Sequence, residues 1–143
     1  ILDAEKGPPP AVSLFNEKNI GHTILKLYKN DFIESAHDVS LGGIIVAISK
    51  MCIKGNKGIK ISMLKNFMNK FEYFFSEDQA RYIVEIKKDN LEKVIDILDK
   101  NSVHYDKLGI ITKNDIEIEG EPKLSIDELA KYNNNWIKDY MVN

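Results

Sequence analysis

The sequence predicts an α+β domain with a mixed, largely antiparallel sheet covered by helices. Three observations favour this class: strand-like and helical patterns are mixed along the chain, one pattern is typical of a hairpin, and 143 residues suffice for a single core. A hairpin makes its two strands antiparallel neighbours, which disfavours a doubly wound parallel sheet. We expect residues 13–143 to form this domain and residues 1–12, a polar segment containing three prolines, to be a linker from an upstream domain.

The first half of the chain predicts two helices and two strands. Apolar side chains three and four residues apart indicate a helix that Ser13 caps, that ends near Lys29 and that covers a sheet. Residues 32–39 have the pattern of a short buried strand. The apolar run 44–55 indicates a helix that begins at a Gly-Gly pair and ends at its last glycine, and residues 58–64 alternate like a strand.

The next segments predict a helix, a strand and a helix. Residues 67–74 have a short amphipathic pattern, and the β-branched and aromatic run 80–87 is suited to a central strand. Asp89 followed by Glu92 is typical of a capping box, so we expect a helix to begin there.

The end of the chain predicts a strand, a hairpin and a last helix. LGIITK (108–113) favours the strand, and the following IEIEGEPKLSI favours a hairpin that turns at Gly120. Ser125 and Glu128 form a second capping box for the last helix. Its apolar positions are Leu129, Tyr132 and Trp136.

Composition excludes several function classes. Lys plus Arg (20) nearly balances Asp plus Glu (22), and Arg81 is the only arginine, so we expect no nucleic-acid binding. Apolar runs fall short of the roughly 18 residues of a membrane span, so we expect no membrane association and a cytoplasmic location. The lone Cys52 is expected to be a buried small residue. The three scattered histidines have no metal-ligand spacing, so no metal site is predicted.

The first candidate site is the polar turn AHDVSLGG, which stands directly before the apolar run. His37, Asp38, Ser40, Gly42 and Gly43 would lie at a helix N-terminus, where backbone N–H groups and the helix dipole favour phosphate. An alternative is local capping, in which the side chains of Asp38 and Ser40 accept hydrogen bonds from the first helical amides while His37 hydrogen-bonds within the fold. The residues alone leave both interpretations open.

The second candidate site is FSEDQAR, which ends at the start of the predicted strand 80–87. It places Ser76, Glu77, Gln79 and Arg81 at the mouth of a rigid element, where binding side chains are often found. The alternative is a solvated turn with a surface ion pair between Glu77 and Arg81, worth little energy.

Four segments in this order resemble one enzyme family: GPPPAVSL, SAHDVSLGGIIVAISKM, FFSEDQARYIVEI and LSIDELAKYNNNWIKDYM. Together they are similar to the C-terminal end of phosphoribosylformylglycinamidine synthase, of the small bacterial type of synthetase subunit. The family lies in the aminoimidazole ribonucleotide synthetase-like superfamily, and the resemblance covers essentially the whole chain.

The resemblance implies an ATP-dependent ligase of purine biosynthesis that converts formylglycinamide ribonucleotide to its amidine with glutamine-derived ammonia. It implies ATP and magnesium for the full enzyme, with none held by this domain alone. The implied partners are upstream ATP-binding domains of the same polypeptide, a glutaminase subunit and a small accessory subunit. The turn at residues 37–43 would face a nucleotide cleft, and Ser76, Glu77, Gln79 and Arg81 would line a substrate-like pseudo-site.

Three departures from the family pattern favour a structural role. Leu41 replaces an acidic residue usual in the turn. In the second motif Asp78 replaces a smaller Ser, and Ala80 replaces the commoner Gly or Ser. We therefore expect no catalytic residue here and a domain that supplies cleft wall and interdomain surface. The alternatives are a domain of a related superfamily synthetase, or a stand-alone binding or assembly module that forms a homodimer through its sheet.

Overall fold

The computed structural model describes residues 11–62 and 69–142 and confirms the α+β class. In chain order the elements are α1 (Leu14–Lys29), β1 (Ser35–Asp38), α2 (Gly43–Gly55), β2 (Gly58–Ile61), α3 (Lys70–Phe75), β3 (Tyr82–Glu85), the 3₁₀ turn η1 (Lys88–Asn90), α4 (Leu91–Lys100), β4 (Gly109–Thr112), β5 (Ile116–Ile118) and α5 (Ile126–Val142). The predicted linker and the end of the strand predicted over 58–64 lie largely outside the described residues. None of the described helices is long and apolar enough to cross a membrane.

The strands form two small sheets in place of the one sheet that we expected. β1 and β3 make an antiparallel ribbon in which Ala36 lies opposite Val84. In the second sheet β2 is central, antiparallel to β4 and parallel to β5. The prediction that 80–87 forms a central strand is therefore wrong.

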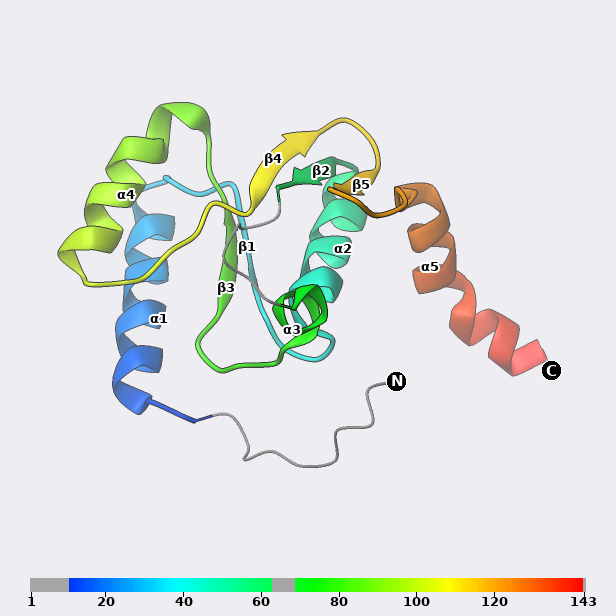
Figure 1. Cartoon of the computed structure of the whole chain (residues 1–143), viewed down its shortest axis with the longest axis horizontal. Helices are drawn as coiled ribbons and strands as arrows, with labels where there is room; N and C mark the ends of the chain where they lie inside the picture. Colours follow the sequence, from blue (N-terminus) through cyan, green and yellow to red (C-terminus); the bar gives the residue numbers. More distant parts are fainter. Residues whose placement is uncertain (1–10, 63–68, 143) are drawn as a thin grey trace.

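The apolar run of β3 has a different cause. Ile83 packs against the cluster that contains α2, whereas Val84 packs against the cluster between α1 and α4. Side chains of neighbouring strand residues point to opposite faces, so both faces of the ribbon are covered by helices. Figure 1 shows this ribbon with α1 and α4 on one side and α2 and α3 on the other. The pattern of β3 records burial on two faces, not a central position in a sheet.

Two hydrophobic clusters hold these layers together. The smaller cluster joins α1 and α4 to the ribbon, and its buried members are Leu27, Ile33, Val94 and Leu98. The larger cluster surrounds α2 and includes the fully buried Ile48, Ile61 and Ile116 together with Ile126 at the start of α5. α2 is therefore the central helix of the fold, with α3, α5 and the ribbon all in contact with it.

Two of the three predicted caps are confirmed. Ser13 Oγ accepts a hydrogen bond from the backbone N–H of Asn16 at 3.3 Å, and Ser125 Oγ accepts one from Glu128 at 3.4 Å. The capping box at Asp89 is wrong, because Asp89 lies inside the 3₁₀ turn η1. The N-cap residue of η1, which has extended backbone, is Lys87. Neither η1 nor α4 begins with a side-chain cap.

The predicted hairpin is present in a minimal form. Ile116 and Leu124 exchange two backbone hydrogen bonds of 2.9 and 3.0 Å, and Gly120 between them has φ +80°. Helix α3 begins after Asn69, whose side chain accepts a hydrogen bond from Phe71 N–H, so this helix starts later than the sequence predicts.

Candidate functional site

The ribbon brings the two candidate motifs together at one end. Asp38, the last residue of β1, lies opposite Tyr82, the first residue of β3, and Val39 N–H donates to the carbonyl of Arg81 at 2.8 Å. A cleft of about 330 Å³ lies at this end. Of the predicted site residues, Asp38, Ser40, Glu77, Gln79 and Arg81 line it.

Glu77 adds a side-chain contact between the two motifs. Its carboxylate Oε1 accepts a hydrogen bond from the backbone N–H of Gly42 at 2.7 Å. The neighbouring N–H of Gly43 donates to the carbonyl of Ser40 at 2.9 Å. The capping alternative, in which the side chains of Asp38 and Ser40 bind these amides, is wrong. The carboxylate arrives from the other motif and occupies the position where a helix N-terminus favours an anion.

The Gly-Gly pair is required by backbone conformation and by packing. Gly42 and Gly43 have φ of +85° and +69°, in the left-handed region that side chains disfavour. A Cβ atom on Gly43 would lie 2.5 Å from the carbonyl oxygen of Phe74 and 2.8 Å from the Cα of Phe75. The glycines therefore let α3 end directly against the start of α2.

Arg81 stabilises the second motif from within. Its Nη1 donates to Ser76 Oγ at 2.7 Å and to the Ser76 carbonyl at 3.2 Å, and it lies 3.5 Å from Asp78 Oδ2. The ion pair between Glu77 and Arg81 in the alternative interpretation is wrong, because Asp78 is the carboxylate beside the guanidinium.

His37 is not among the residues that line the cleft. Its Nδ1 lies 2.6 Å from the carbonyl oxygen of Asp38 and 3.5 Å from Asp38 Oδ1. Alternation along β1 places neighbouring side chains on opposite faces, which explains why Asp38 lines the cleft and His37 does not. Glu17, on the first turn of α1, also lines the cleft, although it was not among the predicted site residues. Its spacing within α1 gave no sign of this position.

Comparison with known proteins identifies the family of this chain. The model of the family described as "AIR synthase related protein, C-terminal domain" matches residues 1–120. The chain belongs to this family.

Relatives of this AIR synthase related domain align over its whole length. The phosphoribosylformylglycinamidine synthase subunit PurL of Pelagibacter ubique is 55% identical over 143 residues, which are 100% of this chain and 20% of that protein. The same subunit of Bartonella quintana is 34% identical over 141 residues, 99% of this chain and 19% of that protein. The chain thus spans about a fifth of the length of these relatives.

Solved structures share the fold. The phosphoribosylformylglycinamidine synthase II of Thermotoga maritima has a TM-score of 0.72 at 21% identity, over 85% of this chain and 22% of that chain. T. maritima PurL complexed with ATP has a TM-score of 0.68 at 20% identity, over 79% of this chain and 21% of that chain. PurLQS from T. maritima has a TM-score of 0.71 at 22% identity, over 90% of this chain and 23% of that chain.

The cleft of this AIR synthase related domain does not fit a nucleotide triphosphate or its magnesium ion. Three carboxylates, those of Glu17, Asp38 and Glu77, line the cleft with a single guanidinium. That guanidinium already binds Ser76 and lies beside Asp78, so little positive charge is left for phosphates. Within the described residues no group of three His, Cys, Asp or Glu side chains is placed to hold a metal ion.

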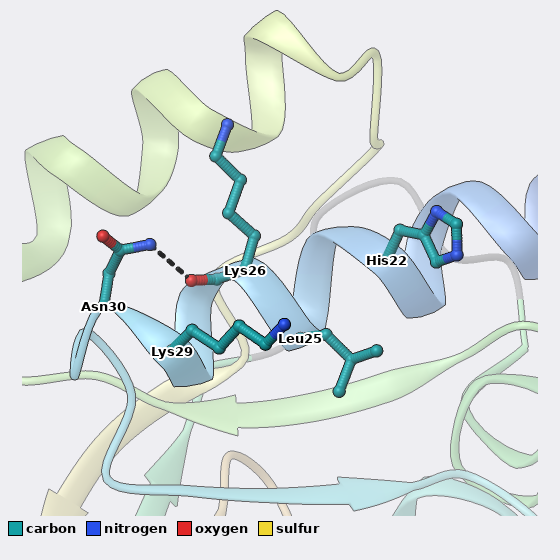
Figure 2. Close-up of a pocket in the computed structure, with 5 residues that line it drawn as sticks. All are labelled: His22, Leu25, Lys26, Lys29 and Asn30. Atoms are coloured by element: carbon teal, nitrogen blue, oxygen red, sulfur yellow. Dashed lines mark hydrogen bonds between the residues drawn. The ribbon is translucent and has the colours of Figure 1, made fainter.

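A second hollow, of about 410 Å³, lies along α1 and is lined by His22, Leu25, Lys26, Lys29 and Asn30. Figure 2 shows that the basic side chains are spread along the helix and do not converge. Asn30 Nδ2 donates to the carbonyl of Lys26 at 2.7 Å, which caps the helix end. The lysines complement the negative end of the helix dipole. The hollow therefore has a structural explanation.

Proposed function

We propose that this chain forms the C-terminal part of an ATP-dependent phosphoribosylformylglycinamidine synthase of the PurL type. In this proposal the enzyme converts formylglycinamide ribonucleotide to formylglycinamidine ribonucleotide with glutamine-derived ammonia, in the cytoplasm. The observation that carries it is the 55% identity to the P. ubique subunit along all 143 residues.

In this proposal the domain supplies cleft wall and interdomain surface, and the reacting groups lie elsewhere in the enzyme. Two features support this role: Glu77 and Arg81 are both engaged by the domain itself, and carboxylates dominate the cleft. ATP, with magnesium, would activate the amide oxygen of the substrate when bound to the whole enzyme. The residues of this chain would shape the adjoining wall and hold the turn at residues 37–43 in place.

The proposed partners are the upstream ATP-binding domains, a glutaminase subunit and a small accessory subunit. The existence of a T. maritima assembly named PurLQS supports a multi-subunit enzyme. A homodimer through the sheet stays an alternative prediction.

A chimera tests the proposal. The matching fifth of P. ubique PurL is replaced by this chain, and ADP release is followed with ATP, magnesium, ammonia and formylglycinamide ribonucleotide. We expect substrate-dependent turnover close to that of the unaltered relative, whereas the relative lacking this fifth should be inactive. A chimera that is folded and inactive would contradict the proposal and favour a stand-alone binding module.

A variant pair tests the wall role within the chimera. Glu77→Gln keeps an oxygen that can accept the Gly42 N–H, so turnover should persist once the protein is folded. Asp78→Asn serves as the matched control, because Asp78 is an exposed neighbour of Glu77 whose carboxylate lies beside Arg81. Loss of turnover in folded Glu77→Gln alone would assign Glu77 a chemical role and refute the wall role.

A further inference from the structure

Helix α5 carries three exposed aromatic side chains beyond its buried start. Tyr132, Trp136 and Tyr140 recur every fourth residue, so they lie on one side of the helix, and they are 76%, 61% and 76% exposed. Ile137 and Met141 beside them are exposed as well. Exposed apolar patches of this kind mark interaction sites.

This surface continues from the core of the domain. At the start of α5, Ile126 is buried in the cluster around α2, and Leu129 packs against that cluster. Figure 1 shows the rest of α5 running away from the body of the molecule. The same helix thus begins inside one hydrophobic core and then presents apolar side chains that the described chain leaves largely exposed.

The comparisons separate α5 from the rest of the domain. The match to the AIR synthase related family ends at residue 120, before α5 begins at Ile126. The PurL relatives align over 141 and 143 residues and therefore include α5. The helix is shared with PurL proteins and lies outside the part that defines the wider family, which points to an occupant found in PurL proteins.

The size of the surface favours an occupant in the same polypeptide. An aromatic side chain buries roughly 150–250 Å² when covered, so these three side chains at their present exposure offer roughly 300–500 Å². Two separate copies need about 800 Å² on each partner for a stable interface. Domains of one chain manage with less, because the covalent connection supplies a high effective concentration.

We propose that the Tyr132–Trp136–Tyr140 face of α5 docks onto the other four fifths of a PurL-type polypeptide and fixes this domain to it. The inference rests on the proposed function, and it assigns the interdomain contact to α5. In the isolated chain this face is open to solvent, and in the whole enzyme it is covered.

Hydroxyl-radical footprinting read by mass spectrometry tests this, with the isolated chain compared with the P. ubique chimera. We expect oxidation of Trp136, Tyr140 and Met141 to fall several-fold in the chimera. Tyr28 on α1, which is 71% exposed, is the matched control and should be oxidised equally in both. Equal oxidation of the α5 residues in both proteins would overturn the inference.

Two further readouts keep the result unambiguous. The double variant Trp136→Ala and Tyr140→Ala should leave the melting temperature of the isolated chain unchanged and lower that of the chimera, whereas Tyr28→Ala should change neither. An active chimera with unprotected α5 would overturn the docking role and leave the proposed function intact. An inactive chimera would count against the proposed function. If protection of α5 in the isolated chain rose with protein concentration, the occupant would be a second copy, and the inference would be overturned.

Discussion

The turn before α2 and the Tyr132–Trp136–Tyr140 face of α5 differ in whether their groups find partners inside the domain. The turn has the sequence of a ligand site, yet its Gly42 amide donates to Glu77 of the second motif, where Arg81 in turn binds Ser76. These polar groups therefore find partners inside the domain. The Tyr132–Trp136–Tyr140 face of α5 carries no recognisable chemical motif, yet its aromatic side chains are largely exposed in the described chain. In this domain, exposed apolar side chains indicate an interaction surface, whereas the polar motif does not.

The largest effect that we predict tests whether the turn is fixed by packing. Gly43→Ala should lower the free energy of unfolding by about 3 kcal/mol, because it combines a left-handed backbone with a clash against Phe74 and Phe75. Urea denaturation followed by circular dichroism measures this. Gly21→Ala is the control: nothing lies within 4 Å of its Cβ position in α1, so it should stabilise the chain by about 0.5–1 kcal/mol. Equal effects at the two glycines would mean that the turn is loosely packed.

The second prediction concerns α2, the helix that both regions contact. Burial, followed by the negative charge of Glu85, raises the pKa of the Cys52 thiol to about 11 from its usual value near 9. Because the folded-state pKa is the higher one, the unfolded chain releases its proton first, and stability is lost as pH rises from 9 towards 11. Relative to Cys52→Ala, the wild type should lose roughly 2 kcal/mol by pH 10.5. Paired urea titrations at pH 8 and pH 10.5 measure this difference, and a constant difference would show that the thiol is hydrated.

Much of the fold could be predicted from periodicity, and the exceptions have physical causes. α1, α2 and α5 follow from their apolar spacing and from Ser13 and Ser125 as caps. The division into two sheets could not be predicted, because residues 80–87 give the same apolar run whether neighbours are strands or helices. In the candidate site, the two motifs were predicted separately. Their contact through Glu77 and Gly42 depends on the pairing of β1 with β3, which no local pattern specifies.

The third prediction removes the side-chain contact between the motifs. Glu77→Ala should cost about 1 kcal/mol of unfolding free energy, the usual value for losing a side-chain acceptor at a helix N-terminus. Asp78→Ala, which removes an exposed carboxylate 3.5 Å from Arg81, should cost less than about 0.5 kcal/mol. If the two substitutions cost the same free energy, water accepts the Gly42 N–H as well as Glu77 does. The turn would then be less firmly held by the domain, and its difference from α5 would be smaller.

The smallest effect that we predict concerns Ala80, which lines the cleft with φ +59°. A side chain in the left-handed region costs about 1–2 kcal/mol, whereas glycine adopts that region freely. Glycine also makes the unfolded chain more flexible, which costs about 0.4–1 kcal/mol. Ala80→Gly should therefore stabilise the isolated chain by about 0.5–1 kcal/mol, measured by urea denaturation. A loss of stability would show that Ala80 has a negative φ in the isolated chain in solution. The turn at Ala80 would then resemble α5, as a part of the domain whose final state depends on a partner.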